Sequence, residues 1–170
     1  MRILGIDPAL KITGYGVIAL ISNGKENQFS RKKKFFLLEA GIISTSAKEP
    51  HAKRLEKIYQ AAEKLVSDVR PDVIVLEKLY AHYRHPTTAY ILGQARGIIC
   101  LVAAKRKIPL VEYSATRVKK AVVGRGLAPK SQVQRMVAHL LELKTLPKYA
   151  DVTDALALAI AHSYIANSVI

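Results

Sequence analysis

Short apolar runs separated by polar turns dominate the first third of the chain, and this pattern is typical of β-strands. Gly14 and Gly16 lie within the second run, where the absence of a side chain allows another backbone to approach closely. A polar, basic segment with a turn signal at Asn23-Gly24 follows it. The pattern predicts an antiparallel meander of three strands, over residues 2–7, 13–21 and 35–45.

Helical periodicity begins after the third predicted strand. Apolar side chains recur every three to four positions between Pro50 and Val69, which predicts an amphipathic helix. The continuous apolar run at 73–77 is typical of a central strand that is buried on both faces, and a further apolar run at 110–113 predicts a fifth strand. Further helices are predicted over 87–107, 116–123, 129–143 and 148–166. This order of elements predicts an α/β protein with one mixed sheet and helices on both faces.

Length and composition set limits on this picture. The chain has 170 residues, which suits one compact domain, and half of them are hydrophobic, which excludes a disordered chain. The residues after Met1 do not resemble a signal peptide, and no run reaches the ~20 apolar residues of a membrane span. We therefore expect a cytoplasmic protein.

The charge balance points to an acidic partner. The formal net charge is +14, and nucleic acid is the most common partner of so basic a chain. A generally basic, soluble protein is the alternative. The segment 102–135 is especially dense, with nine basic residues against the single acid Glu112: Lys105, Arg106, Lys107, Arg117, Lys119, Lys120, Arg125, Lys130 and Arg135. We expect this segment to bind phosphates of the nucleic-acid backbone.

Acidic residues are scarce, so their positions are informative. Asp7 ends the first predicted strand and Glu77 ends the fourth. If these strands are neighbours, both carboxylates point into one crevice outside the strand ends. Asp151 and Asp154 lie three residues apart at the start of the last predicted helix, on one face of it.

Four crowded carboxylates repel one another unless a hard cation neutralises them. Oxygen ligands without Cys or His suit Mg²⁺ or Mn²⁺, and two such ions can activate a water and stabilise the leaving oxygen of a phosphodiester. Each acid also has a structural explanation: a turn for Asp7, a solvated strand end for Glu77, and helix capping for the aspartate pair. Their joint placement in a basic chain favours a metal-dependent nuclease.

Four sequence blocks resemble one known family. They are Gly5-Ile6-Asp7-Pro8 with Thr13-Gly14-Tyr15-Gly16-Val17, then Leu92-Gly93-Gln94-Ala95-Arg96-Gly97, then 118–124 with Lys130-Ser131-Gln132-Val133, and finally Ala150-Asp151-Val152-Thr153-Asp154-Ala155-Leu156-Ala157. Together, and in this order, they resemble the RuvC family of crossover junction endodeoxyribonucleases. The resemblance covers nearly the whole chain.

The resemblance implies a ribonuclease-H-like fold over residues 1–170, a single nuclease domain with sheet order 3-2-1-4-5 and an antiparallel second strand. It implies a Holliday junction resolvase of DNA recombination and repair. Such an enzyme is a homodimer that uses Mg²⁺ and makes paired symmetric nicks with 5′-phosphate and 3′-hydroxyl ends. The implied catalytic and metal-binding residues are Asp7, Glu77, Asp151 and Asp154.

The resemblance also implies how DNA is held. Lys119 and Lys130 fall on the family's phosphate-contacting lysines, and Tyr80 falls on an aromatic residue near the junction centre. We add Lys120 and Arg125 as DNA-binding residues from the basic segment. The implied partners are a second copy of the chain, which the small residues of helix 87–107 would accommodate, and the branch-migration proteins RuvA and RuvB.

The chain departs from the family pattern at Lys78, in the loop 81–86 and in the longer basic connection 23–34, so its sequence preference at the cut site is open. Two other functions compete with the resolvase. One is a catalytically silent junction-binding protein, which the presence of all four acids does not support. The other is a small actin-like ATPase or sugar kinase, for which the chain is too short and lacks a second Gly-rich phosphate motif.

Overall fold

The computed structural model describes residues 1–21, 34–79 and 86–166. The strands are β1 (Arg2–Asp7), β2 (Ile12–Ile21), β3 (Lys34–Ser44), β4 (Val73–Glu77) and β5 (Leu110–Tyr113). The helices are α1 (His51–Val69), α2 (Pro86–Arg106), α3 (Ala115–Val123), α4 (Lys130–Leu140) and α5 (Ala150–Ala166). Within the described ranges, no helix is long and apolar enough to cross a lipid bilayer.

The strands form one five-stranded sheet in the order β3-β2-β1-β4-β5. The first three strands are an antiparallel meander, as the sequence predicts. Strand β4 then returns through α1 to pair parallel with β1, and β5 pairs parallel with β4. This confirms the mixed sheet, its order and the antiparallel second strand.

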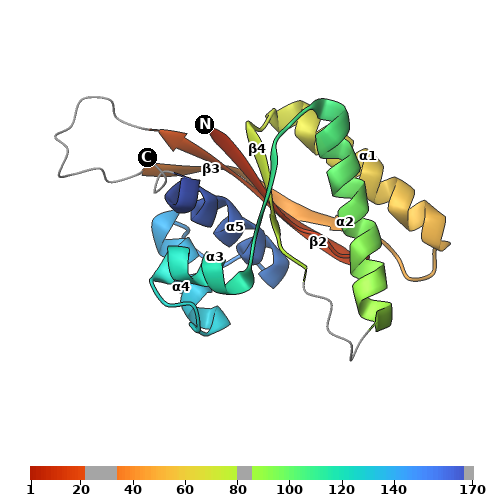
Figure 1. Cartoon of the computed structure of the whole chain (residues 1–170). Coiled ribbons are helices and arrows are strands. Elements are labelled where there is room, and N and C mark those ends of the chain that lie inside the picture. The colour runs from red at the N-terminus through yellow and green to blue at the C-terminus, as the bar shows by residue number, and fades with distance from the viewer. Residues whose placement is uncertain (22–33, 80–85, 167–170) are drawn as a thin grey trace.

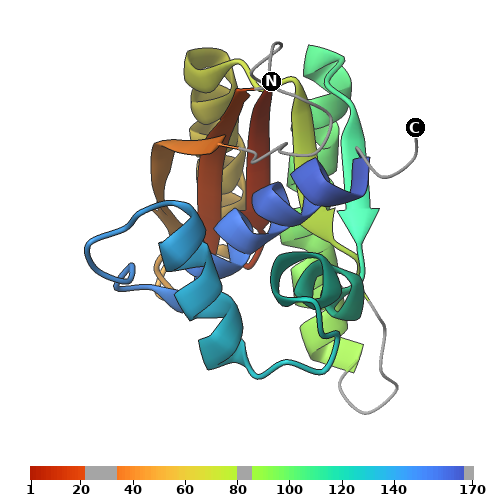
Figure 2. The ribbon, with the colours of Figure 1, turned by 90° about the vertical axis from the view of Figure 1, so that its left-hand side faces the viewer.

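Alternating side chains of the central strands supply two separate cores. Leu4 and Ile6 of β1, with Ile74 and Leu76 of β4, are fully buried on the face covered by α1 and α2. Ile3, Val73 and Val75 are buried on the opposite face, under α3, α4 and α5. Figure 1 shows the sheet between these two helical layers, and Figure 2 shows α5 running obliquely across the strands.

The predicted helix over 129–143 is too long. Helix α4 ends at Leu140, because the backbone turns into the left-handed region at Glu142, where φ is 52°. The N–H of Leu143 then donates to the carbonyl of Ala138 at 2.9 Å, which closes the helix end. An αL residue that is not glycine gives no signal in the sequence, and this explains the error.

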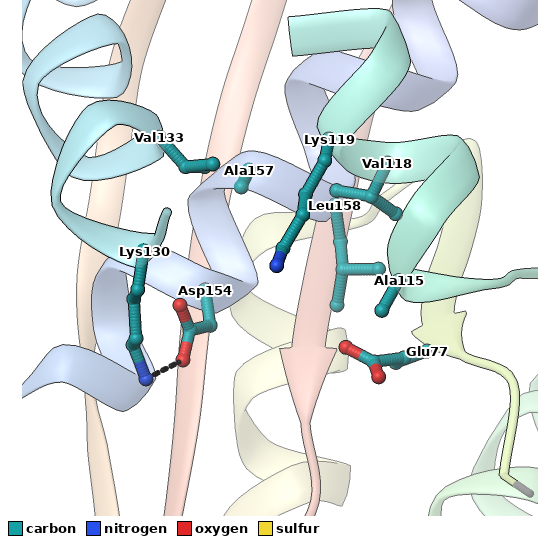
Figure 3. A pocket seen from close by; sticks show the side chains of 9 residues that line it. All are labelled: Glu77, Ala115, Val118, Lys119, Lys130, Val133, Asp154, Ala157 and Leu158. Carbon is teal, nitrogen blue, oxygen red and sulfur yellow. Dashed lines mark ion pairs between the residues drawn. The ribbon is translucent and has the colours of Figure 1, made fainter. Parts of the chain in front are cut away.

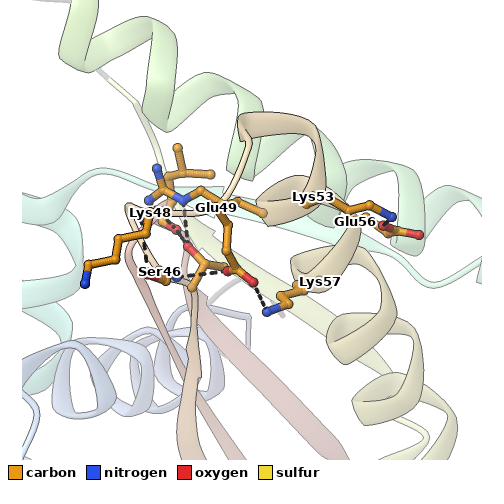
Figure 4. A network of polar contacts seen from close by, with 9 residues as sticks. Ser46, Lys48, Glu49, Lys53, Glu56 and Lys57 are labelled. Atoms are coloured by element: carbon orange, nitrogen blue, oxygen red, sulfur yellow. Dashed lines mark hydrogen bonds and ion pairs between the residues drawn. The ribbon is translucent and has the colours of Figure 1, made fainter.

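The connection between β3 and α1 is held by polar side chains (Figure 4). The Ser46 N–H donates to the Glu49 carboxylate at 3.2 Å, as in the capping box found at helix N-termini. Lys57, in the second turn of α1, forms an ion pair with the same carboxylate. These contacts fix where the chain enters α1, on the far side of the sheet from α5.

Candidate active site

Asp7 and Glu77 end two adjacent parallel strands. Ile6 of β1 is in register with Leu76 of β4, so the two acids that follow are neighbours at the same edge of the sheet. Both alternate with residues that face the α1–α2 layer, and therefore both project toward α5. The structure thus brings the two carboxylates together, as the sequence predicts for neighbouring strands.

Two glycines bring the start of α5 onto this edge. A Cβ on Gly14 would lie 2.2 Å from the carbonyl oxygen of Asp151, and one on Gly5 would lie 1.9 Å from that of Ala155. Gly14 is the register partner of Asp7 in the β1–β2 ladder. Asp151 is therefore held beside Asp7, and the close approach predicted at Gly14 is confirmed.

The electrostatics show that the four acids form one cluster. Burial raises the pKa of the half-buried Asp7 to about 6, and the charges of Asp154, Glu77 and Asp151 contribute to this rise, in that order. Desolvation and the charge of Asp154 likewise raise the pKa of Glu77 above its ordinary value. Lys130 acts in the opposite direction and lowers the pKa of both groups. The cluster thus stores like-charge repulsion that a cation would relieve.

Glu77 and Asp154 line a pocket of about 210 Å³ between α3, α4 and α5 (Figure 3). Two lysines point into it from opposite sides. Lys119 comes from α3, and its charge lowers the pKa of Glu77. Lys130 comes from the first turn of α4, and its Nζ forms an ion pair with Asp154 at 2.6 Å. The pocket therefore combines carboxylates, which suit bound cations, with ammonium groups, which suit a negatively charged phosphate.

The donor set suits a hard divalent cation in its chemistry. All four acids offer oxygen atoms, and the charges of the other three add to the burial that raises the pKa of Asp7. In the described part of the chain, however, no three His, Cys, Asp or Glu side chains are arranged as a ready metal cage. The Lys130 ammonium supplies counter-charge to Asp154 instead. The residues present thus fit a divalent cation, provided that side chains rearrange around it.

The turn after Asp7 is closed by a residue that the sequence analysis did not assign. Thr13 is fully buried, and its Oγ1 donates to the Ala9 carbonyl at 2.7 Å while it accepts from the Ala9 N–H at 3.1 Å. Arg54 of α1 and Thr45 both donate to the carbonyl of Leu10 in the same turn. A threonine a few residues beyond an Asp-Pro turn is the signal from which this closure is predictable.

The other predicted DNA-binding residues lie around the pocket or outside the described chain. The stretch from α3 to α4 has six basic residues and no acid, and its exposed side chains include Lys120 and Arg125, which do not line the pocket. Tyr80, the loop 81–86 except its last residue, and residues 23–33 fall outside the described residues.

The basic segment 102–135 does not form one surface. Lys105 and Arg106 are at the end of α2, in the layer on the other side of the sheet, where Arg106 pairs with Glu63 of α1. The expectation of a continuous phosphate-binding segment is therefore wrong for residues 105–107. Strand β5 separates them from α3, because the chain passes from one face of the sheet to the other there (Figure 1).

Comparisons with known proteins agree with this architecture. A family model described as "Crossover junction endodeoxyribonuclease RuvC" matches residues 3–162. Proteins with the same name from Rhodopirellula baltica and Brevibacillus brevis are 40% and 43% identical to this chain. The first match covers 98% of this chain and 88% of the relative, and the second covers 96% and 92%.

Solved structures extend the likeness to three dimensions. The structure of Thermus thermophilus RuvC matches with a TM-score of 0.86 and 32% identity, covering 99% of this chain and 96% of that one. A second structure of the T. thermophilus protein, in complex with a Holliday junction substrate, matches with the same TM-score and 28% identity, covering 99% and 97%. With the ribonuclease-H-like sheet and the matching family model, these results show that the chain belongs to the RuvC family of crossover junction endodeoxyribonucleases.

Proposed function

We propose that this chain is a Holliday junction resolvase, which introduces paired symmetric nicks into four-way DNA junctions during recombination and repair. One observation carries the proposal. Four carboxylates meet where β1, β4 and α5 come together: burial raises the pKa of Asp7, and the charges of Asp154, Glu77 and Asp151 raise it further. Membership of the RuvC family supplies the substrate class, because a close structural relative is complexed with a Holliday junction.

The family implies the use of a divalent metal, and we propose Mg²⁺, with two ions in each active site. Asp7, Glu77, Asp151 and Asp154 would hold them. When bound, such ions activate a water and stabilise the leaving oxygen of the phosphodiester. The chain's own contribution is to gather the four carboxylates at one edge of the sheet and to aim two lysines at the same pocket.

The test is cleavage of a synthetic four-way junction beside a linear duplex of the same sequences. We expect nicks only in the junction, only with Mg²⁺, and at symmetric positions that a ligase reseals, since the ends carry 5′-phosphate and 3′-hydroxyl groups. EDTA is expected to stop the reaction. Junction binding without cleavage in Mg²⁺ or Mn²⁺ would identify a silent binding protein and refute the proposal.

We further propose that Lys119, Lys120, Arg125 and Lys130 bind phosphates of the junction arms. The first three lie on α3 and the connection after it, beside the pocket, and no acid interrupts the sequence from Ala115 to Leu140. Lys130 is paired with Asp154 in this structure, so its contact with a DNA phosphate requires that ion pair to open. Contacts of this kind place the DNA without reading its sequence.

Replacement of Lys119 by alanine is expected to weaken binding to junctions of any sequence by a similar factor. Loss of one phosphate contact reduces the slope of log affinity against log salt concentration by ~0.9. The measurement is a salt titration of junction binding in EDTA. Lys64→Ala, on the exposed side of α1, is the control and is expected to leave the slope unchanged. An altered base preference at constant slope would mean that Lys119 reads bases.

We propose a homodimer whose contact is a stripe along α2 formed by Tyr90, Gly93, Gly97 and Leu101. These residues recur every three to four positions on the exposed side of the helix, and Tyr90 and Leu101 are 67% and 49% exposed. A Cβ on Gly93 or Gly97 would meet no atom within 4 Å, so another helix can approach there. A twofold axis through this stripe would pack the stripe of one copy against the same stripe of the other and bury both.

A charge in this stripe is expected to separate the two protomers. Leu101→Glu places two carboxylates in one self-complementary contact, so light scattering is expected to report a monomer at concentrations where the parent chain is a dimer. Lys144→Glu lies on the exposed connection between α4 and α5. It makes the net charge of the protein more negative than Leu101→Glu does, and it is expected to leave the dimer intact. A dimeric Leu101→Glu protein would place the contact elsewhere.

Three further parts of the proposal rest on the sequence and on the family resemblance. Tyr80 would stack on an unpaired base at the junction centre, RuvA and RuvB would be partners, and the enzyme would act in the cytoplasm. Stacking on an aromatic ring tolerates any base, which suits a nuclease that recognises shape before sequence. Tyr80 lies three residues beyond Glu77 in the sequence, so we expect it to act close to the carboxylate cluster.

A further inference from the structure

Arg96 of α2 makes contacts that the proposed function does not use. Its Nη1 donates to the backbone carbonyl of Glu77 at 2.6 Å, and its Nη2 forms an ion pair with the carboxylate of Glu112 in β5. The Arg96 side chain is only 12% exposed. A single guanidinium thus joins a helix to the ends of the two adjacent strands β4 and β5.

Arg96 reaches Glu77 from the opposite side of the sheet. It belongs to α2, whereas the Glu77 side chain lines the pocket between α3 and α5. Glu112 lies between Val111 and Tyr113, which pack on the α3–α5 side, so its own side chain points toward α2. Arg96 therefore contacts the backbone of Glu77 from behind and stays away from the pocket.

The peptide unit between Glu77 and Lys78 is fixed at both of its polar groups. The Lys78 N–H donates to the Tyr113 carbonyl at 2.8 Å, and the Glu77 carbonyl accepts from Arg96. The two polar groups of one peptide unit point in opposite directions, so the Glu77 carbonyl points away from β5 and toward β1. Strand β1 ends at Asp7, and the next residue, Pro8, has no N–H to donate. The Arg96 guanidinium supplies the donor that β1 lacks at this position.

We propose that Arg96 is a positioning residue for Glu77, and that Glu112 holds its guanidinium in place. The inference rests on the proposed function, because it assigns Glu77 to the metal-binding cluster. Fixing the peptide plane fixes the direction in which the Glu77 side chain leaves the backbone. Arg96 also lies between Gly93 and Gly97 of the proposed dimer stripe, so the same helix would connect the second protomer with the carboxylate cluster.

A second ion pair provides a matched comparison. Arg106 lies further along α2 and pairs with Glu63 of α1. It has the same side chain on the same helix and a carboxylate partner, and its Nε and Nη2 both donate to the Glu63 carboxylate of α1. Replacing each arginine by methionine removes one guanidinium and one ion pair. Only the change at Arg96 removes a hydrogen bond to the backbone of the cluster.

The experiment measures Mn²⁺ affinity of the DNA-free protein by calorimetry, and single-turnover cleavage of a saturating junction. Loss of a residue that orients a metal ligand typically costs 10- to 100-fold in metal affinity or activity. We expect Arg96→Met to lose roughly that much in both measurements, with junction affinity in EDTA within about twofold of the parent. Arg106→Met is expected to match the parent in all three.

Two further variants separate positioning from general stability. Arg96→Lys keeps the charge and one donor but loses the fork that bridges two acceptors, so a partial recovery of Mn²⁺ affinity is expected. Glu112→Gln keeps an oxygen acceptor for Arg96, so a smaller loss is expected. The double variant Arg96→Met/Glu112→Gln is expected to be no worse than Arg96→Met alone, because both changes act through one contact.

Several results would overturn the inference. They are parent-like Mn²⁺ affinity and cleavage in a folded Arg96→Met protein, equal losses in Arg106→Met, or a loss of junction affinity as large as the loss of cleavage. If Arg96→Met does not fold, the Arg96→Lys and Glu112→Gln proteins decide by the same criteria. Failure of the parent chain to cut junctions would refute the proposed function, whereas the Mn²⁺ comparison would still test Arg96.

Discussion

Replacing Asp7 with asparagine is expected to abolish junction cleavage and, in the absence of metal, to make the protein more stable at neutral pH. Cleavage is expected to fall by at least roughly 10³-fold, because a neutral amide holds divalent cations poorly and about 4 kcal/mol of barrier corresponds to three decades. Junction binding in EDTA is expected to persist, since the basic surface is unchanged. Losing function and gaining stability together is the signature of a strained charge cluster.

The stability gain depends on pH in a defined direction. The pKa of Asp7 is about 6 in the folded chain and near its ordinary value of 3.8 when unfolded. Well below pH 3.8 the carboxyl is protonated in both states and costs nothing. As pH rises through 3.8 toward 6 the unfolded chain ionises first, so this group makes the fold progressively less stable. Above pH 6 the cost is constant.

The size of this cost follows from the same shift. About two pH units correspond to about 3 kcal/mol, and we expect about 1–2 kcal/mol because the carboxylate keeps contact with water. For a chain of this length, that raises the melting temperature of Asp7→Asn by roughly 2–8 °C at pH 7.5. At pH 4 only a small part of this gain is expected, because the unfolded carboxyl is only partly ionised there. Asp68→Asn, on an exposed ion pair of α1, is the control for a lost charge.

Thermal unfolding in EDTA at the two pH values is the measurement. An Asp7→Asn protein that melts at the parent temperature at pH 7.5 would show that Asp7 is not under electrostatic strain. Cleavage within tenfold of the parent would remove Asp7 from the metal-binding cluster altogether. The cleavage rate tests the role of Asp7 in function, and the melting temperature tests the electrostatics. Either hypothesis can therefore fail without the other.

The fold follows from the sequence to the extent that local patterns and strand alternation decide it. The apolar runs at residues 2–7 and 73–77 predict strands, and alternation along them sends Asp7 and Glu77 to one face. The end of α4 is not predictable in the same way. It depends on a left-handed backbone at Glu142, a residue type with no preference for that conformation.

The acidic cluster was predictable because scarce acids fall at strand ends and at a helix start. Its supporting contacts were not. Lys130 meets Asp154 only because α4 packs beside α5, and Arg96 meets Glu77 only because α2 lies behind β4. Such contacts join residues that lie about 20 positions apart in the chain. They depend on how whole helices sit on the sheet, which periodicity within one segment does not specify.

Gly14→Ala is expected to damage the active site without removing any charged group. The new Cβ would lie 2.2 Å from the carbonyl oxygen of Asp151 and 2.3 Å from its carbonyl carbon. These are backbone atoms of α5, so no side-chain rotation relieves the overlap, and the first turn of the helix must move away from β2. Asp151 moves with it, away from Asp7, the register partner of Gly14.

The expected cost has two parts. Overpacking of this kind typically destabilises by about 1–3 kcal/mol. A displacement of about 1 Å at a reacting centre reduces the rate by roughly 100-fold. We therefore expect a folded Gly14→Ala protein, with a lower melting temperature, weakened Mn²⁺ binding, and roughly 100-fold slower single-turnover cleavage. Junction affinity in EDTA is expected to match that of the parent, because α3 and α4 carry the basic side chains.

Gly41→Ala is the matched control for Gly14→Ala. Gly41 lies in β3, one strand further from β1, and its new Cβ would lie 2.7 Å from the hydroxyl oxygen of Tyr15. That atom is the far end of a side chain at the sheet surface, which can rotate away at the cost of its hydrogen bond to Glu39. Gly41→Ala is thus expected to lower the melting temperature slightly and to cut junctions at the parent rate. Equal rates for the two variants would mean that the close contact between β2 and α5 does not set the position of Asp151, and that the cluster is held by other contacts of α5.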